Sequence, residues 1–177
     1  STRVWVSVVG IASIFFGSKG YADTVISVAD FGLKPDTREN AVAYVQKAIE
    51  ACRGKEPVTL VFPEGRYDFW PQYAHEKNYY ETNTYDVFPK RLAMLFEGLH
   101  NITVDGNGSQ FVMHDRIQPI TVENCDGVTL KNFSIDWDIP LTAQARVTKV
   151  GSDFFEIEIN VLESPYIIED GKLVFVG

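Results

Sequence analysis

The side chains with the clearest chemical potential in this sequence are two aspartates, Asp136 and Asp138, which flank Trp137. Residues 133–135 before them are predicted to form a strand, so the triplet lies at a strand end. Alternate strand residues point to one face, which places both carboxylates on one surface and Trp137 on the other. In glycosidases a pair of carboxylates protonates the leaving oxygen and activates water or attacks the sugar. We predict that Asp136, Trp137 and Asp138 bind substrate rather than catalyse.

A structural interpretation of the same triplet stays open, because aspartates at strand ends often form turns and Trp137 would then belong to the core. The three histidines, His75, His100 and His114, have no carboxylate at metal-ligand spacing. We therefore expect them at the surface or in turns, without a metal-binding or acid–base role.

The stretch of residues 66–92 is rich in aromatic side chains. It shows no sustained period of two or 3.6 residues and is predicted to be a long irregular loop. Aromatic rings bind the apolar faces of sugars, and they also pack over cores, so both roles are open. The residues concerned are Tyr67, Phe69, Trp70, Tyr73, Tyr79, Tyr80, Tyr85 and Phe88.

The composition of the chain limits its partners. The 177 residues are 45% hydrophobic and 13% aromatic, which suits a packed core and excludes general disorder. A formal net charge of −8 argues against a nucleic-acid partner, whose phosphates need a basic face. Two cysteines, Cys52 and Cys125, are too few for a disulfide scaffold or a zinc cluster. We expect buried free thiols in preference to a mutual disulfide.

Residues 1–22 differ from the rest of the chain. Arg3 precedes an uncharged apolar run, residues 4–16, and small residues then occur at Gly20 and Ala22. This layout predicts a secretory signal peptide, with a membrane anchor or a core helix as the alternatives. The run has about 13 residues against the ~20 that a spanning helix needs, so no membrane span is expected in the mature chain. The protein is expected to be exported, to the periplasm, the outer surface or the medium.

The elements that must position these residues begin with a strand–helix–strand pattern. Residues 25–28 and 58–62 are β-prone, and between them the apolar residues from Ala41 to Cys52 are spaced by three and four. This spacing predicts an amphipathic helix. We expect the helix to cap the otherwise exposed first layer of a sheet structure.

Short strands follow from Ala93 onward, alternating with turns rich in Gly, Asn and Asp. Residues 96–104 resemble residues 122–130 at an offset of 26 residues, which would place Ile102 under Val128. Such a repeat is typical of a β-solenoid, in which strands of successive layers pair in parallel. The predicted fold class is all-β, a right-handed parallel β-helix with an N-terminal capping helix.

After Pro140 the pattern changes to alternating residues 143–150 and 154–160, which predict an antiparallel hairpin, and residues 173–176 predict a further strand. We interpret this segment as the start of an inserted antiparallel β-barrel. The predicted organisation is a signal peptide (1–22), an N-terminal cap with the first coils of a parallel β-helix (23–140), and the start of the inserted β-barrel domain (141–177).

Two motifs carry a resemblance to known proteins. Residues 25–32, followed by the predicted helix and by residues 61–67, resemble the opening of the pectate-lyase-like β-helix superfamily. Residues 101–115 and 132–138, with the change at Pro140, are similar to the α-1,3-galactosidases of glycoside hydrolase family 110. The resemblance covers about residues 25–177 and only the N-terminal portion of such an enzyme.

This resemblance implies an exo-glycosidase that removes terminal α-1,3-linked galactose with inversion, including the blood-group-B determinant. It implies terminal galactosides as partners, carboxylates as catalytic groups, and no metal or other cofactor. The catalytic aspartates are expected beyond Gly177, so no catalytic residue is assigned to this chain and the chain alone is expected to be inactive. The alternatives are a polysaccharide lyase or polygalacturonase of the same fold, or a non-catalytic glycan-binding β-helix.

Overall fold

A computed structural model describes residues 24–78 and 89–176 of the chain. The predicted signal peptide (1–22) and four of the aromatic residues, Tyr79, Tyr80, Tyr85 and Phe88, lie outside the described residues. Within these ranges strands predominate over a single α-helix, which confirms the all-β class. No helix of the described part is long and apolar enough to cross a membrane.

Short strands make up most of the described chain, with one 3-10 turn and one α-helix between them. In chain order the elements are β1 (Thr24–Ser27), η1 (Val28–Phe31), α1 (Val42–Cys52), β2 (Val58–Val61), β3 (Arg66–Phe69), β4 (His75–Lys77), β5 (Lys90–Glu97), β6 (His100–Met113), β7 (Gln118–Glu123), β8 (Asp126–Trp137), β9 (Ala145–Val150), β10 (Phe155–Ile159), β11 (Tyr166–Glu169) and β12 (Lys172–Phe175).

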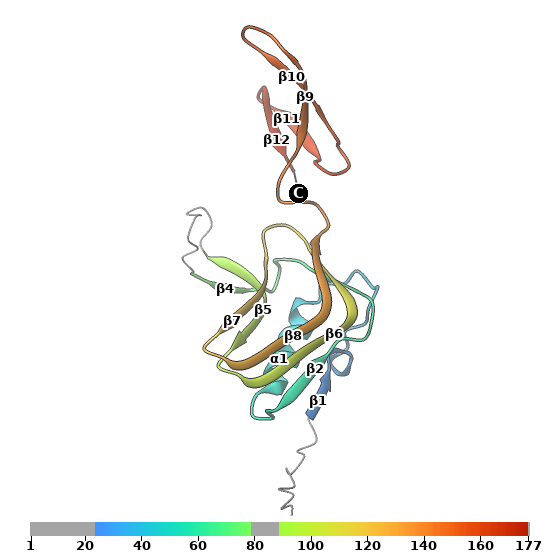
Figure 1. Cartoon of the computed structure of the whole chain (residues 1–177), viewed down its shortest axis with the longest axis vertical. Helices are drawn as coiled ribbons and strands as arrows, with labels where there is room; N and C mark the ends of the chain where they lie inside the picture. The colour runs from blue at the N-terminus through green and yellow to red at the C-terminus, as the bar shows by residue number, and fades with distance from the viewer. Residues whose placement is uncertain (1–23, 79–88, 177) are drawn as a thin grey trace, which may run out of the picture.

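Parallel pairing between successive layers organises residues 24–137. β2 lies between β1 and β6, β6 also pairs with β3 and β8, and β5 pairs with β7, all in parallel. Phe96 pairs with Val122 and Ile102 with Val128, so the predicted offset of 26 residues is confirmed. The layers are visible as stacked ribbons in Figure 1.

The offset changes at the corner in the middle of β6. Asp105 still pairs with Lys131, but Ser109 pairs with Phe133 and Met113 with Trp137, which reduces the offset from 26 to 24 residues. The corner of β8 is therefore two residues shorter than the corner below it. After the corner, from Ser109 to Met113, this difference decides which residue of β8 lies above which residue of β6.

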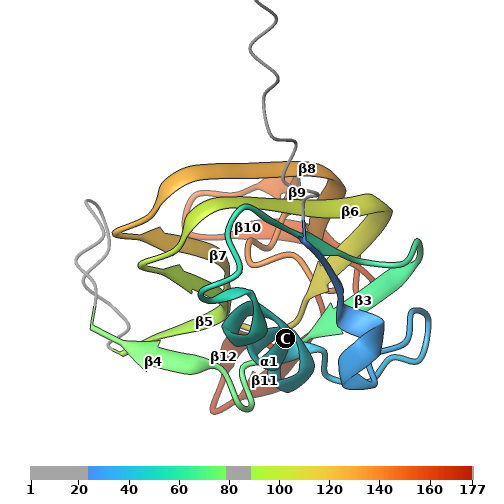
Figure 2. The same ribbon diagram turned by 90° about the horizontal axis from the view of Figure 1, so that it is seen from below.

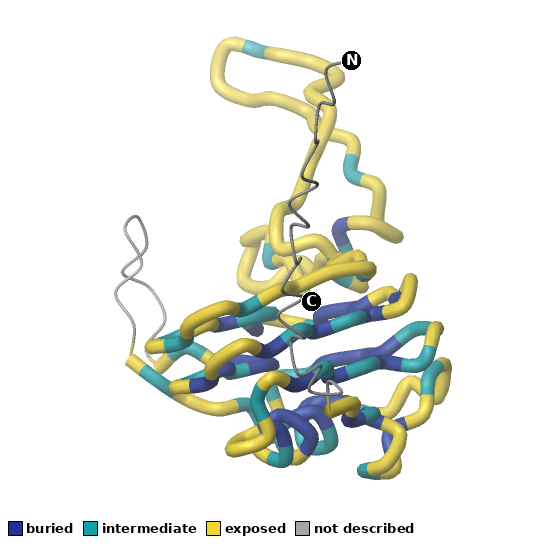
Figure 3. Tube along the Cα trace, turned by 60° about the horizontal axis from the view of Figure 1, so that its bottom comes forward, coloured by how far each residue is buried: buried dark blue, intermediate teal, exposed yellow. Residues whose placement is uncertain are grey.

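The core lies inside the stacked layers and under α1. Every layer contributes inward apolar side chains, among them Leu60, Phe62, Phe96 and Phe111, none of which is accessible to solvent. α1 buries the predicted stripe against the first layer, and Figure 2 shows the helix covering that end of the stack of layers. Burial is deepest in the lower layers and decreases at β8 (Figure 3).

The aromatic stretch is more regular than predicted. Residues 66–69 form β3, where Tyr67 and Phe69 are buried, and residues 75–77 form β4, so the prediction of a continuous irregular loop is wrong. The period of two was too short to detect because it spans only four residues. Tyr73, by contrast, is exposed.

Beyond Pro140 the chain forms two antiparallel pairs that project from the layered part (Figure 1). β9 pairs with β10, as predicted, and β12 pairs with β11, a strand that the sequence pattern did not indicate. Apolar side chains in this part face solvent, including Phe155, Leu162 and Ile168. Whether this segment opens a barrel stays a prediction.

Candidate functional site

Three consecutive layers end in a vertical row of polar and aromatic side chains, Trp70, His114 and Asp138. The ladder sets this order, because the His114 amide donates to the Phe69 carbonyl at 2.9 Å and the Asp138 amide donates to the Met113 carbonyl at 3.0 Å. The rings of Trp70 and His114 stack with centroids 3.9 Å apart and planes inclined by 6°. The row therefore has a fixed geometry at the carboxyl ends of β3, β6 and β8.

The carboxylate of Asp68 organises the groups around this row. Its side chain is fully inaccessible to solvent, yet it accepts two hydrogen bonds from Arg66 Nε, at 3.1 and 3.0 Å, and one from Arg66 Nη2 at 2.6 Å. His114 Nε2 lies 2.8 Å from Asp68 Oδ1, which fixes the imidazole from its inner side. Burial by itself raises the pKa of Asp68, but the hydrogen bonds from Arg66 and His114 outweigh it and lower that pKa.

Arg66 connects the buried aspartate to the exposed one. Its Nη2 atom also donates to Asp138 Oδ1 at 2.9 Å, and the Asp138 side chain is 43% exposed. Arg38 is a second guanidinium near both carboxylates, with Nη1 3.7 Å from Asp68 Oδ1 and 3.9 Å from Asp138 Oδ1. The hydrogen bonds to Asp68, and secondarily to Asp138, raise the pKa of Arg66 above its usual range. The guanidinium is thus a permanent cation shared by two acids.

This arrangement suits binding of a polyhydroxylated ligand. Asp138 presents acceptor oxygens to solvent, Arg38 presents donors, and the mostly buried imidazole of His114 lies with its Nδ1 3.9 Å from Asp138 Oδ2. Hydroxyl groups need both donors and acceptors at fixed positions, and a site whose side chains are already locked does not have to order them on binding. No group of three or more metal-ligating side chains occurs in the described ranges.

The three residues predicted from the sequence occupy different environments. Asp138 joins the cluster described above. Asp136 is exposed, two residues before Asp138 and paired with Val112, and its carboxylate accepts from the Trp137 amide at 2.8 Å. Trp137 packs against the core while its indole nitrogen donates to the Asp115 carbonyl at 3.3 Å. The structure therefore brings one of the three together with other charged groups.

Sequence reasoning missed Arg66, Asp68 and His114. The expectation that His114 is isolated is wrong, because its carboxylate partner is 46 residues away in the sequence and one layer below in space. A usable signal was present in β3, where Arg66 and Asp68 alternate with the core residues Tyr67 and Phe69. A buried charge that alternates with core aromatics indicates a paired and positioned group.

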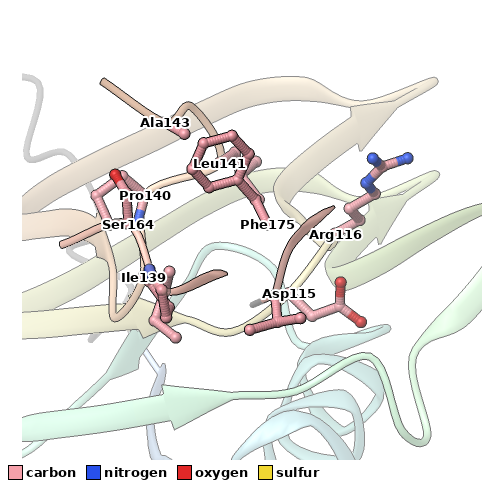
Figure 4. Close-up of a pocket in the computed structure, with 10 residues that line it drawn as sticks. Asp115, Arg116, Ile139, Pro140, Leu141, Ala143, Ser164 and Phe175 are labelled. Carbon is pink, nitrogen blue, oxygen red and sulfur yellow. The ribbon is translucent and has the colours of Figure 1, made fainter. Parts of the chain in front are cut away.

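Two hollows flank the row. One, of about 160 Å³, separates the end of the layered part from the β11–β12 pair, and Figure 4 shows Leu141 and Phe175 at one side of it and Asp115 and Arg116 at the other. The second is an open groove of about 520 Å³ beside Trp70 and Tyr73. Asp115 borders both hollows.

Comparison with known proteins finds close relatives among curated sequences. Alpha-1,3-galactosidase B of Bacteroides thetaiotaomicron is 61% identical over 156 residues, which is 88% of this chain and 25% of that protein. Alpha-1,3-galactosidase A of Shewanella woodyi is 37% identical over 153 residues, 86% of this chain and 25% of that protein. Alpha-1,3-galactosidase B of Phocaeicola vulgatus is 36% identical over 159 residues, with 88% and 25% covered.

These matches confirm the resemblance to the α-1,3-galactosidases. The chain spans about a quarter of the length of the curated relatives it matches. No family model matches the chain.

Proposed function

We propose that this chain, which is homologous to the α-1,3-galactosidases over 88% of its length, is the N-terminal portion of an exported enzyme that hydrolyses terminal α-1,3-linked galactose. The observation that carries the proposal is the 61% identity to an alpha-1,3-galactosidase B, sustained across 156 residues. The locked cluster of Arg66, Asp68, His114 and Asp138 supports it, since its exposed donors and acceptors suit sugar hydroxyls. Inversion at the anomeric carbon belongs to the same proposal.

The finer fold assignment is part of this proposal. Parallel pairing between successive layers, a core inside the stack and a helix across its first layer favour a right-handed parallel β-helix. The antiparallel pairs β9–β10 and β11–β12 are proposed to open an inserted β-barrel. Residues 1–22 are proposed to direct export, and sequencing the amino terminus of the exported protein tests this: a start at about residue 23 is expected, and an exported protein that retains residues 1–22 contradicts it.

Substrate contact is proposed for the end of β8. Asp138 would accept hydrogen bonds from sugar hydroxyls while Arg66 holds its carboxylate in place. Asp136 presents a second carboxylate on the exposed side of the same strand, and Trp137 positions both by anchoring its indole to Asp115. The catalytic carboxylates are proposed to lie outside this chain, in the remaining three quarters of the enzyme's length.

The test of the proposed activity uses the full-length protein that contains this chain. Incubation with the methyl glycoside of α-1,3-galactobiose, from which only the terminal unit is released as free galactose, followed by proton NMR from the first minutes, should show β-galactose appearing before mutarotation. Release of α-galactose first would contradict inversion, and cleavage of pectate with no release of galactose would replace the proposal by a lyase or polygalacturonase.

The contribution of this chain is tested separately with Asp138→Asn in the full-length protein. We expect KM for α-1,3-galactobiose to rise about tenfold, the effect of losing one charged hydrogen-bond acceptor. The control is Asp126→Asn, an exposed residue at the other end of β8, which should leave KM unchanged. An unchanged KM for Asp138→Asn would remove Asp138 from the binding site.

A further inference from the structure

Tyr73 has a backbone conformation that its side chain does not favour. Its φ is +69°, in the left-handed region where bulky residues are rare and where Asn and Gly are the usual occupants. The side chain is 65% exposed, so the strain is not compensated by burial in the core. Backbone strain without a packing benefit is a pointer to function.

The surrounding structure holds this conformation from the inner side. Gln46 Nε2, from α1, donates to the Tyr73 carbonyl at 3.0 Å, and Asn40 Nδ2 donates to the Gln72 carbonyl at 2.8 Å. Asn40 Oδ1 also accepts from the Trp70 amide at 3.3 Å, and the Ala74 amide closes a turn on Pro71. Hydrogen bonds therefore hold the segment from Trp70 to Ala74 as a turn, and the exposed ring of Tyr73 lies at its surface.

Tyr73 borders the open groove of about 520 Å³ described above. Polar side chains surround it, namely an ion pair between Arg91 Nε and Glu76 Oε1 at 3.3 Å, and the carboxylate of Asp115. The volume lies in the range of ligand pockets, roughly 300–1,000 Å³. Trp70 joins the groove to the polar row, because its ring also stacks on His114.

We propose that this groove is a binding subsite for a neutral pyranose ring, with Tyr73 as its platform. The C–H face of a pyranose packs on an aromatic ring, and the carboxylates and guanidinium at the rim match its equatorial hydroxyls. The groove is bordered by the carboxylates of Glu76 and Asp115 and by the guanidinium of Arg91, which is already paired with Glu76, so an anionic ligand is disfavoured. The subsite is distinct from the end of β8 and takes a sugar other than the one that is cleaved.

The sugar in the groove comes from one of two sources, an inner unit of the same substrate or a separate glycan chain. The inference rests on the proposed function only in the choice of galactose-containing probes. N-acetyllactosamine suits the test because it has two neutral pyranose rings and no α-linked galactose to be removed. Its binding is therefore measured independently of any hydrolysis.

The experiment compares full-length wild type with Tyr73→Asn by isothermal titration calorimetry with N-acetyllactosamine. Asparagine tolerates the left-handed conformation, so the melting temperature should stay the same or rise, whereas loss of the ring should weaken binding about threefold to tenfold. Asp126→Asn is the control, since that residue is exposed at the start of β8 and outside the groove, and its binding should equal wild type.

The outcomes separate the sources. If Tyr73→Asn raises KM for a trisaccharide of α-galactose on N-acetyllactosamine and leaves KM for α-1,3-galactobiose unchanged, the groove binds inner sugars of the substrate. Weakened binding with both KM values unchanged assigns it to a separate glycan chain. Failure of wild type to bind N-acetyllactosamine, or equal binding by Tyr73→Asn, overturns the subsite. Absence of turnover with intact binding would instead contradict the proposed activity.

Discussion

Asp68 is a charged residue that solvent does not reach, and the site depends on its partners. Desolvating a carboxylate costs several kcal/mol unless hydrogen bonds and a counter-ion replace the lost water. Arg66 and His114 supply those contacts, so the three residues stabilise one another's positions. Removing the charge leaves Arg66 with an exposed partner, Asp138, and leaves the imidazole without its inner acceptor.

Replacing Asp68 by Asn should therefore destabilise the fold. We expect the free energy of unfolding to fall by about 2–4 kcal/mol, because a buried guanidinium pair is broken while the shape is kept. Urea unfolding followed by circular dichroism measures this. Asp126→Asn, an exposed change on β8, should cost less than about 0.5 kcal/mol, and equal losses in the two variants would contradict the role of Asp68.

The pH dependence of stability has a definite sign at the same residue. The pKa of Asp68 is lower in the folded chain than in the unfolded chain, so its stabilisation is complete above the unfolded value of about 3.9 and disappears as the pH falls through the folded value. The difference in unfolding free energy between wild type and Asp68→Asn should shrink between about pH 5 and pH 2. A constant difference over that range would contradict the assignment.

How far the sequence predicts the site depends on the distance between partners. Asp138 could be identified because a carboxylate at a strand end is a local signal. Asp68 and His114 could not be paired from the sequence, since the hydrogen bond joins residues 46 positions apart. Their proximity follows from the register between β3 and β6, in which Phe69 pairs with Met113, and the local pattern of neither strand contains that register.

At the scale of elements, α1 follows from its sequence almost completely. Its stripe of Val42, Val45, Ala48, Ile49 and Cys52 is buried, and the apolar spacing alone predicted it. β3 was not predicted, because four alternating residues are too few to establish a period and β3 lacks the β-branched run that marks the equally short β1 and β2; β11 was not predicted either. Short strands with such a run are therefore predictable here, whereas β3 acquires its structure from neighbouring layers.

The thiols of the chain should differ in reactivity. Both cysteines are free, as expected, and burial raises the pKa of Cys52 to about 11, so at neutral pH its thiolate is scarce. Iodoacetamide at pH 7.5 should modify the folded chain at Cys125 first and reach Cys52 only on unfolding in urea. Peptide mass mapping distinguishes the two sites. Rapid modification of Cys52 in the folded chain would contradict the burial of this helix face.

Close stacking of layers should make Gly106 intolerant of a side chain. A Cβ there would lie 2.5 Å from the Phe133 Cβ and 2.7 Å from the Asn132 carbonyl oxygen, in the layer above. We expect Gly106→Ala to lower the free energy of unfolding by about 2–3 kcal/mol. Gly54→Ala is the comparison, where no atom lies within 4 Å and only the backbone strain at φ +75° remains, about 1–2 kcal/mol. Equal losses would argue against the tight contact.

At the scale of the molecule, the lower layers and the projecting strands differ in how well they are covered. Val150, Phe155, Leu162 and Ile168 are each more than half exposed, and β8 carries exposed Leu130 and Ile135 as well. Large exposed apolar patches mark interfaces, and these exposed side chains are the material for one. In the full-length relatives, which are about four times longer than the matched region, further chain is available to cover such surface.

The 177-residue chain by itself should therefore self-associate. We expect light scattering after size exclusion to show a mass that rises with concentration, because exposed apolar side chains pair between molecules. Replacing Leu162 and Ile168 by Glu should shift the equilibrium toward monomer. The full-length protein is the reference, and a strictly monomeric 177-residue chain would show that these side chains drive no association.

The longer corner of β6, between Asp105 and Ser109, has a further consequence for engineering. Pairing on the two faces of the stack is set separately, since the ladder tolerates a difference of two residues between Asp105 and Ser109 without losing register on either side. Asn107 and Gly108 there are exposed, and both have positive φ. A short peptide tag or a fluorophore-binding loop inserted between them should leave both ladders intact. The corner of β6 is thus an insertion site at which added residues should leave Asp138 in its place above His114.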